Sequence, residues 1–318
     1  MGLLVSERNG NLRGFVFVNE YPYYLLTSTF GERTMISLRV LFIAVPLFAI
    51  SIPCIAAPLA QHVVVIGVDG LTAKSVEKAD TPNMHALMKS GSYTLAANSV
   101  MPTVSGPNWG AILMGSEPAV NGIHDNEWKL DKNNPFPTIF RALRTSNPGA
   151  TIIAAYEWLD FGRLFTNQDV TQRVNAIKSA LQKDTSENAA AHYIAGQAAR
   201  LIQEKKPQLI FIHLDMIDHA GHTYIYDSDK YNSAVGEVDG LVGAIVKAVD
   251  AAGIRENTAL FVIADHGGKN TGHGGDTPEE KTVPWIVSGA GVVQGAAIPN
   301  GISVAQTSPT IAALLGIA

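Results

Sequence analysis

The sequence contains almost no cysteine and comparatively little charge. Cys54 is the only cysteine in 318 residues, which excludes an intramolecular disulfide and any metal site built from several cysteines. Charged residues make up 16% of the chain and apolar residues 47%, against roughly 25% charged residues in an average soluble domain. This composition excludes a disordered chain and supplies apolar side chains for a large core. Any bound metal must therefore be held by His, Asp or Glu.

An excess of positive charge is also absent. The 23 basic and 28 acidic residues give a formal net charge of −5, and no long basic run occurs. Proteins that bind nucleic acid without sequence preference rely on a cationic surface. We therefore expect no generic nucleic-acid binding.

Residues 35–56 have the layout of a secretory signal peptide. A short basic start precedes an uncharged apolar run, which ends in small residues before a predicted cleavage after Ala56. The run is slightly short for a membrane span of about 20 residues, and Pro46 interrupts it, so a retained anchor is the weaker alternative. A lipid anchor on Cys54 is disfavoured because the preceding residues suit it poorly.

These features predict an exported protein, periplasmic or secreted, with no membrane span in the mature chain. Because the signal begins cleanly at Met35, we interpret residues 1–34 as a non-native extension that results from the choice of start site. Residues 57–318 then form the mature protein.

The mature segment alternates between predicted strands and helices. Continuous apolar runs, typical of strands buried on both faces, occupy 62–68, 151–155, 208–214, 259–264 and 283–287. Helical patterns are clearest over 81–90, 186–204, 231–252 and 303–315. This alternation predicts a single α/β domain with three layers, α/β/α, around a mostly parallel central sheet.

Three of the predicted strands end in aspartate. The residues at and just beyond these ends are Asp69; Asp215, Asp218, His219 and His222; and Asp265, His266 and His273. One such aspartate is commonly a helix cap, but three of them, two followed by histidine, are hard to explain as caps. Ligands of open α/β sheets bind beyond the carboxyl ends of the strands, so these side chains can converge in one crevice. Imidazole and carboxylate together suit zinc and similar divalent ions.

A further candidate, Ser105, lies where a loop turns into a short helix within residues 99–115. A hydroxyl at a helix N-terminus is usually a plain cap. The same position also allows backbone N–H groups and the helix dipole to hold a phosphate. The residues alone leave both roles open.

Taken together, these motifs resemble the alkaline phosphatase superfamily, and most closely its type I phosphodiesterase/nucleotide pyrophosphatase family. Each motif is weak alone, but their order and number carry the resemblance, which covers residues 62–317. They are Asp69-Gly70, Thr81-Pro82-Asn83, Pro102-Thr-Val-Ser105-Gly-Pro107-Asn108, Gly122-Ile-His-Asp-Asn126, Asp218-x-x-Gly221-His222, Asp265-His266-Gly267, His273-Gly274 and the end segment 310–316.

The resemblance implies an alkaline phosphatase-like fold and a phosphoric ester hydrolase with two divalent metal ions, for which zinc is the expected element. One ion would be held by Asp218, His222 and His273, and the other by Asp69, Asp265, His266 and the Ser105 oxygen. Two ions about 3.5–4 Å apart stabilise both the attacking and the leaving oxygen of an in-line displacement. Ser105 would attack phosphorus and form a phosphoseryl intermediate that is then hydrolysed.

Two assignments within this set need comment. Asn108 matches the family position whose amide donates to a phosphoryl oxygen. Asp215 and His219 have the same i, i+4 spacing as Asp218 and His222, so spacing alone leaves both pairs open as ligands. The glycine before His222 fits the family motif and favours the second pair.

The nucleophile segment 99–115 contains no Lys or Arg. A phosphomonoester dianion usually calls for extra cations, whereas a neutral amide suits a singly charged diester. We therefore predict cleavage of phosphodiester or nucleotide pyrophosphate bonds in a small-molecule phosphate ester. Lys129 or Lys269 could reach the site from elsewhere, so a phosphomonoesterase of the alkaline phosphatase type remains the alternative.

Two further classes are disfavoured. Sulfatases of this fold need a Cys/Ser-x-Pro-x-Arg segment, and the position of its arginine is occupied here by Trp109. A non-catalytic binding protein on the same scaffold would be expected to lack ligand positions, yet all of them are present. The sequence carries no indication of oligomeric state.

Overall fold

A computed structural model describes residues 58–129, 134–176, 188–296 and 298–317, together with two short strands closer to the N-terminus. These two strands, β1 (Leu4–Ser6) and β2 (Leu12–Gly14), pair antiparallel with each other. The predicted signal peptide, 35–56, lies outside the described residues. So does the predicted extension, 1–34, apart from β1 and β2.

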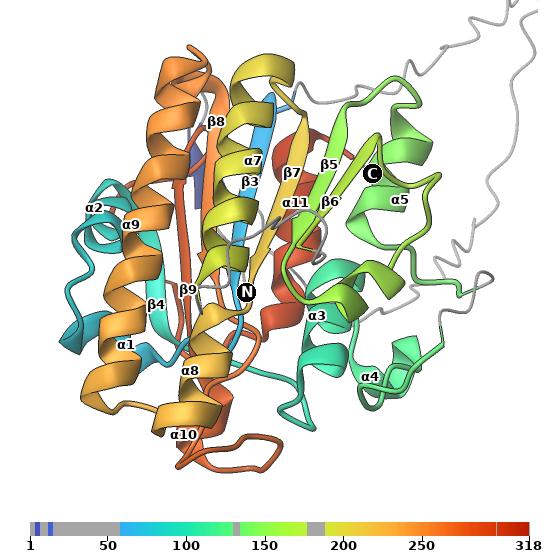
Figure 1. Cartoon of the computed structure of the whole chain (residues 1–318). Helices are drawn as coiled ribbons and strands as arrows, with labels where there is room; N and C mark the ends of the chain where they lie inside the picture. Colours follow the sequence, from blue (N-terminus) through green and yellow to red (C-terminus); the bar gives the residue numbers. More distant parts are fainter. Residues whose placement is uncertain are drawn as a thin grey trace, which may run out of the picture.

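A seven-stranded sheet forms the centre of the molecule, in the order β4-β9-β8-β3-β7-β5-β6 (Figure 1). Its strands are β3 (His62–Val68), β4 (Gly91–Asn98), β5 (Ile152–Tyr156), β6 (Gln172–Asn175), β7 (Leu209–Leu214), β8 (Thr258–Ile263) and β9 (Thr282–Gly289). β9 pairs antiparallel with both β8 and β4, and the other pairings are parallel. The prediction of a mostly parallel sheet is confirmed.

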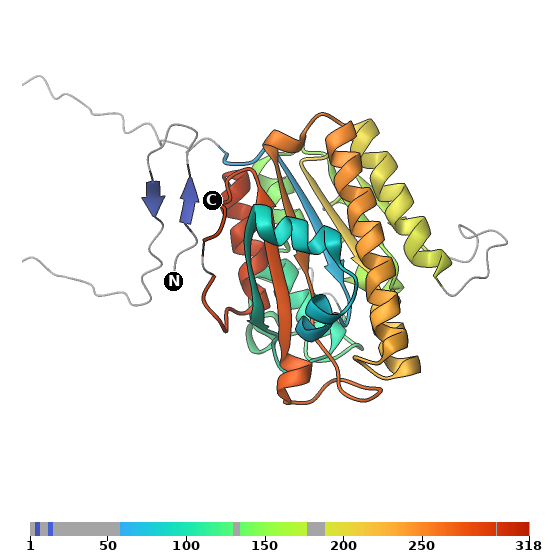
Figure 2. The same ribbon diagram turned by 90° about the vertical axis from the view of Figure 1, so that its left-hand side faces the viewer.

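Helices cover both faces of this sheet. α2 (Pro82–Ser90), α7 (Ala189–Lys205) and α9 (Asp229–Ala251) pack together on one face, and α3 (Ser105–Met114), α5 (Ile139–Ser146) and α11 (Thr307–Leu315) pack together on the other. Figure 2 shows α7 and α9 on one side of the sheet and the red α11 on the opposite side. The predicted three-layer α/β/α architecture is therefore confirmed.

The remaining helices are short. They are α1 (Ala73–Lys78), α4 (Pro118–Asn121), α8 (Met216–Tyr224) and α10 (Pro278–Lys281), with 3-10 turns η1 (Leu159–Arg163), η2 (Arg255–Asn257) and η3 (Val304–Gln306). Within the described part of the chain, no helix combines the length and the apolar character that crossing a membrane requires.

The three strands that end in aspartate are neighbours at the centre of the sheet. β3 lies between β7 and β8 and pairs parallel with both, so all three carboxyl ends meet at one edge of the sheet. This is the lower edge in Figure 1, where α8 begins. The strands are almost entirely buried, as their β-branched and aromatic residues require. The fold thus brings Asp69, Asp215 and Asp265 to one place.

Candidate active site

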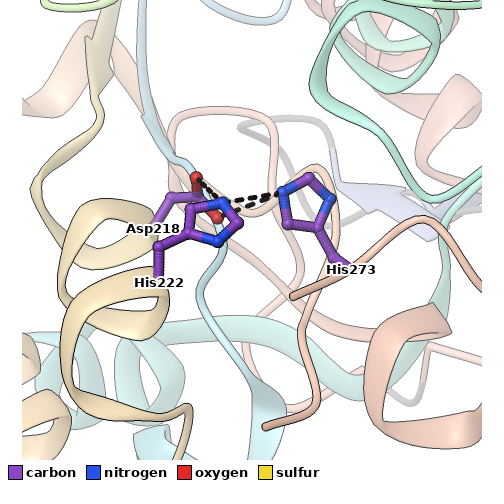
Figure 3. Close-up of side chains that lie close together, drawn as sticks. All are labelled: Asp218, His222 and His273. Carbon is purple, nitrogen blue, oxygen red and sulfur yellow. Dashed lines mark hydrogen bonds and ion pairs between the residues drawn. The ribbon is translucent and has the colours of Figure 1, made fainter. Parts of the chain in front are cut away.

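Asp218, His222 and His273 converge at this edge of the sheet (Figure 3). Asp218 and His222 lie one turn apart on α8, and the His222 Nε2 atom is 3.1 Å from Asp218 Oδ2. His273 comes from the loop after β8, and its Nε2 atom lies 3.2 Å from His222 Nε2 and 3.6 Å from Asp218 Oδ1. One ligand atom from each residue lies within 4.8 Å of the others, which suits a single metal ion.

Backbone carbonyls orient both imidazoles. His222 Nδ1 is 2.8 Å from the carbonyl oxygen of Thr271, and His273 Nδ1 is 2.8 Å from that of Thr103. Because a carbonyl only accepts, each Nδ1 carries a proton that it donates. Both Nε2 atoms then face the space beside Asp218, which is the arrangement of metal-bound histidines.

Tyr226 supports Asp218 from the far side. Its hydroxyl donates to Asp218 Oδ1, and its ring packs directly against Gly221 and Gly268. A Cβ atom at either glycine would overlap that ring. The glycine of the Asp218-x-x-Gly221-His222 motif therefore makes room for the side chain that orients the first residue of the motif.

Asp69, Asp265 and His266 form a second, deeper group with no exposed side-chain surface. His266 Nε2 lies 3.4 Å from Asp69 Oδ1 and 3.3 Å from Asp265 Oδ2. The Gly70 N–H donates to Asp265 Oδ1 at 3.2 Å, with Gly70 at φ 68°, and a Cβ there would overlap Asp218. The glycine after Asp69 is therefore required both by its backbone angle and by the approach of Asp218.

Two carboxylate oxygens in this group have no hydrogen-bond partner among the described residues. They are Asp69 Oδ1 and Asp265 Oδ2, and both are fully buried. The Nδ1 of His266 lies 2.9 Å from the Gly267 carbonyl, so its Nε2 presents a lone pair to both oxygens. Converging buried anions and lone pairs are unfavourable unless a cation lies between them. The donor set therefore fits a divalent metal ion.

The pKa values of the group agree with a missing positive charge. Burial, followed by repulsion from Asp218, raises the pKa of Asp69 to about 7. Burial also lowers the pKa of His266 to about 3, which keeps its imidazole neutral and able to bind a metal. In the shallower group, the hydrogen bond with Asp218 raises the pKa of His222 to about 9. A cation that binds there displaces that proton.

The two groups are adjacent. The His266 and His273 rings stack with centroids 3.8 Å apart, and Asp69, Asp218 and His266 also form a set that could hold a metal. The structure thus brings together all six predicted His and Asp ligands. It provides room for two neighbouring cations that share the surroundings of Asp218.

Ser105 is the first residue of α3 and is nearly buried. Its hydroxyl lies 3.2 Å from His266 Nε2 and donates to that lone pair. The N-terminal N–H groups of α3 lie next to the hydroxyl, and the positive end of the helix dipole favours an anion there. The predicted nucleophile is therefore beside the deeper candidate cation position.

Asn108 has a different role from the one that the resemblance implied. Its side chain is fully buried, its Oδ1 accepts from the Val100 N–H at 2.7 Å, and its Nδ2 donates to the carbonyls of Pro102 and Val104 at 3.0 and 2.9 Å. The amide is saturated by the loop before α3 and has no donor left for a phosphoryl oxygen. Asn108 fixes this loop and thereby the position of Ser105.

Asn126 is the amide that lies beside Ser105. Its Oδ1 accepts from the Gly106 N–H at 2.7 Å, and no partner of its Nδ2 is found among the described residues. Arg163 holds this segment, since its guanidinium donates to the carbonyls of Asn126 and Trp128 and stacks on the Trp128 ring. Asn126 ends the Gly122-Ile-His-Asp-Asn126 motif, whose residues alone do not indicate this role.

The geometry distinguishes the two candidate ligand pairs of α8, which have the same spacing in the sequence. His219 is exposed, and the Asp215 N–H donates to Glu157 at 2.7 Å at the start of the helix. Asp215 instead lies near Asp69 and His213. Asp218 and His222 are the pair that meets His273.

The sequence signal was too weak to reveal some supporting residues. His213, inside β7, is fully buried, and its Nε2 lies 3.1 Å from Asp69 Oδ2. Trp109 donates to the same oxygen, and Tyr226 donates to Asp218. None of these three residues belongs to a short motif, and only the fold brings them to the site.

Comparison with known proteins supports the same reading. The human ectonucleotide pyrophosphatase/phosphodiesterase family member 1 is 28% identical over 196 residues, which is 58% of this chain and 21% of the human protein. The GPI ethanolamine phosphate transferase 3 of Eremothecium gossypii is 35% identical over 106 residues, 32% of this chain and 10% of that protein. The chain thus spans about a fifth or less of the length of these two relatives.

Solved structures share the fold. The murine ectonucleotide pyrophosphatase/phosphodiesterase 5 matches with a TM-score of 0.65 and 15% identity, over 81% of this chain and 96% of that one. A 2-O GAG sulfatase matches with a TM-score of 0.67 and 17% identity, over 81% and 71%. Residues 63–280 match the profile described as type I phosphodiesterase / nucleotide pyrophosphatase. The chain therefore belongs to the type I phosphodiesterase/nucleotide pyrophosphatase family of the alkaline phosphatase superfamily.

Proposed function

We propose that this protein is a two-metal hydrolase that cleaves phosphodiester or nucleotide pyrophosphate bonds, with Ser105 as the nucleophile. One observation carries the proposal: the unpartnered buried oxygens of Asp69 and Asp265 and the imidazole of His266 converge beside the Ser105 hydroxyl. The names of two relatives, the human ectonucleotide pyrophosphatase/phosphodiesterase family member 1 and a pyrophosphatase/phosphodiesterase of Schizosaccharomyces pombe, agree with this reaction class. We propose zinc as the metal, because imidazole and carboxylate ligands suit it.

Bound cations would supply Lewis acidity for the phosphoryl oxygens and for the Ser105 oxygen. The chain itself provides the remaining functions. Asp69, Asp265 and His266 would hold the deeper cation, and Asp218, His222 and His273 would hold the shallower one. Ser105, fixed at the start of α3, attacks phosphorus and displaces the leaving-group oxygen, which departs as an alcohol or a phosphate and takes up a proton. Water then cleaves the phosphoseryl ester, which releases the phosphoryl product and restores the Ser105 hydroxyl. The Asn126 Nδ2 is positioned to donate to a phosphoryl oxygen.

The engagement of the basic side chains considered for this site favours a diester substrate. The Arg163 guanidinium is engaged by two carbonyls, and Lys269 is exposed and lies 3.7 Å from Glu279. Lys129 is exposed and borders a separate hollow next to α4. Since none of these three described side chains offers a free guanidinium or ammonium group at Ser105, we propose that the site suits a singly charged phosphoryl group better than a dianion.

The substrate class can be tested directly. The zinc-loaded protein should hydrolyse bis-p-nitrophenyl phosphate faster than p-nitrophenyl phosphate, and p-nitrocatechol sulfate slowest. A large rate advantage for the monoester would contradict the diesterase and favour a phosphomonoesterase on the same site.

The nucleophile is tested by Ser105→Ala. This variant should lose turnover of every ester while it keeps both equivalents of zinc, measured by metal analysis after gel filtration. Ser105→Thr, which retains a hydroxyl, is the matched control. Activity retained in Ser105→Ala would exclude Ser105 as the nucleophile.

We also propose export to the periplasm or the outside of the cell, supported by the pattern of residues 35–56. Cell fractionation and N-terminal sequencing test this. The expected outcome is an exported form that begins at Ala57, and an unprocessed cytoplasmic chain would contradict it.

A further inference from the structure

One carboxylate oxygen of Asp69 lies within hydrogen-bond distance of two donors from the core. The Trp109 Nε1–H donates to Asp69 Oδ2 at 2.9 Å, and His213 Nε2 lies 3.1 Å from the same atom. All three side chains have no exposed surface. The other oxygen, Oδ1, has no hydrogen bond and faces His266. The two oxygens of the carboxylate therefore differ: Oδ2 is hydrogen-bonded and Oδ1 is not.

The protonation of His213 follows from its partners. A carboxylate oxygen that accepts from Trp109 can also accept from His213, so Nε2 carries the proton. Its Nδ1 has no hydrogen-bond partner among the described residues. Both side chains thus direct an N–H group at the same oxygen of Asp69, and they leave Oδ1 available to a cation.

Packing makes the two donors rigid. The Trp109 ring meets the rings of Phe161, Phe211 and His213 edge-on, with centroids 5.8, 5.8 and 4.9 Å away. A Cβ atom at Gly67 of β3 would overlap the indole, so that glycine provides its space. Because the core fixes the rings of Trp109 and His213, buried side chains and not water molecules determine the orientation of the Asp69 carboxylate.

The indole also links Asp69 to the nucleophile. Ser105 and Trp109 are four residues apart on α3, so they project from one face of the helix. The helix thus places the Ser105 hydroxyl next to His266 at the deeper cation position. It places the Trp109 N–H next to Asp69 Oδ2, the oxygen of Asp69 that does not face His266.

We propose that Trp109 and His213 are positioning residues that hold Asp69 Oδ2, so that Oδ1 is aimed at the cation shared with Asp265 and His266. The inference rests on the metal site of the proposed function, but not on its substrate. Groups that hydrogen-bond to metal ligands typically change metal affinity by 10–100-fold when they are removed.

A competing reading is that His213 is itself a ligand. Asp69, His213 and Asp215 lie close enough to hold a third ion. A cation there would need Asp69 Oδ2, which already accepts from Trp109 and lies next to the His213 N–H. The positioning role accounts for both contacts, and metal stoichiometry distinguishes the two readings.

The test measures zinc binding by competition with a chromophoric chelator, in the absence of substrate. His213→Leu removes the donor, whereas His213→Gln places an amide N–H at a similar reach. Trp109→Phe keeps an aromatic ring but removes the indole N–H. Phe261→Leu is a packing control, because Phe261 is equally buried and its ring contacts Trp285 instead of Trp109.

We expect two zinc equivalents in the wild type, one of which weakens by about 10–100-fold in His213→Leu and in Trp109→Phe. His213→Gln should stay within about threefold of the wild type, because the hydrogen bond is retained. Phe261→Leu should lower the melting temperature and leave both affinities unchanged.

The proposal is overturned if His213→Leu binds both equivalents as the wild type does, or if His213→Gln loses as much affinity as His213→Leu. Loss of a third equivalent in His213→Leu would instead identify His213 as a ligand. Because no substrate is present, these outcomes are independent of the diesterase assignment. Failure of that assignment would leave two zinc equivalents with the same dependence on His213.

Discussion

The individual ligands of this site are each oriented by a contact on the side away from the metal position. Backbone carbonyls hold the Nδ1 atoms of His222 and His273, and the Tyr226 hydroxyl holds Asp218. Such contacts fix tautomers and ring orientation before a metal binds. The metal-free protein is therefore largely pre-organised.

Two asparagines near Ser105 should behave differently when they are truncated. Asn126→Ala should lower kcat on bis-p-nitrophenyl phosphate by about 10²–10³-fold, the usual effect of losing one oxyanion donor. Its melting temperature should change little, since Asn126 is only half-buried.

Asn108→Ala should instead cost about 1–3 kcal/mol of unfolding free energy, because the Val100 N–H and two loop carbonyls lose their partner. Urea unfolding and steady-state kinetics on both variants provide the comparison. A pure kcat defect in Asn108→Ala, at wild-type stability, would restore the direct role that its structure argues against.

The candidate metal ligands could be predicted from the sequence, but the residues that orient them could not. Asp69, Asp265 and His266 directly follow buried strands, so their position could be predicted from apolar runs alone. The hydrogen bonds of Asn108 argue against the donor role that its motif position implied, because motif position does not reveal that its amide is used by its own loop. Trp109, His213 and Tyr226 reach the site through tertiary packing, which leaves no local pattern.

At the level of helices and strands, prediction succeeded where burial is complete. β3, β7 and β8 are continuous apolar runs and lie at the centre of the sheet. The two strands missed, β4 and β6, are its edges. β4 alternates irregularly between buried and exposed residues, and β6 has four residues, three of them only partly buried. Edge strands carry a weaker apolar signal because one side has no partner strand.

The packing of α8 depends on Gly221. An alanine there would push against the Tyr226 ring, whose hydroxyl donates to Asp218. We expect Gly221→Ala to cost about 1–3 kcal/mol of stability through overpacking and to weaken zinc binding, as followed by chelator competition. In Gly240→Ala the new methyl group has open space, which makes it the control. Unchanged zinc affinity in Gly221→Ala would show that Tyr226 does not support Asp218.

Between α5 and β6, Asp169 anchors a loop through charge-assisted hydrogen bonds. Arg141 Nε donates to Asp169 Oδ1 at 3.1 Å, and the Thr166 N–H donates to Oδ2 at 2.6 Å. Burial opposes the charged form, but these bonds outweigh it and lower the pKa of Asp169. Asp169→Asn should therefore destabilise the protein by about 1–3 kcal/mol at neutral pH.

The sign of the pH dependence follows from the lowered pKa. The stabilisation from Asp169 is complete above its unfolded pKa of about 3.9 and is lost as the pH falls through the folded pKa. The difference between wild type and Asp169→Asn in urea unfolding should be constant above about pH 5 and shrink below about pH 4. A difference that grows towards low pH would rule out the ionic contribution.

For the whole molecule, metal binding should be visible as stability. Zinc binds a site that exists only in the folded chain, so at 100 times the dissociation constant it should add about 2.7 kcal/mol per ion. Differential scanning fluorimetry should show a higher melting temperature with zinc and a lower one after EDTA. Ser105→Ala should keep most of this shift and His266→Ala should lose a large part of it. Identical melting with and without zinc would contradict the metal site.

The central position of β3 between β7 and β8 has a consequence for the lifetime of the native protein. Asp69, Asp218 and Asp265 follow strands from opposite halves of the chain, so the ligands meet only after these strands have paired. We therefore expect the cation to bind after the main folding barrier and to leave the refolding rate nearly unchanged. It should instead slow unfolding, which makes the metal a source of kinetic stability and of resistance to proteolysis.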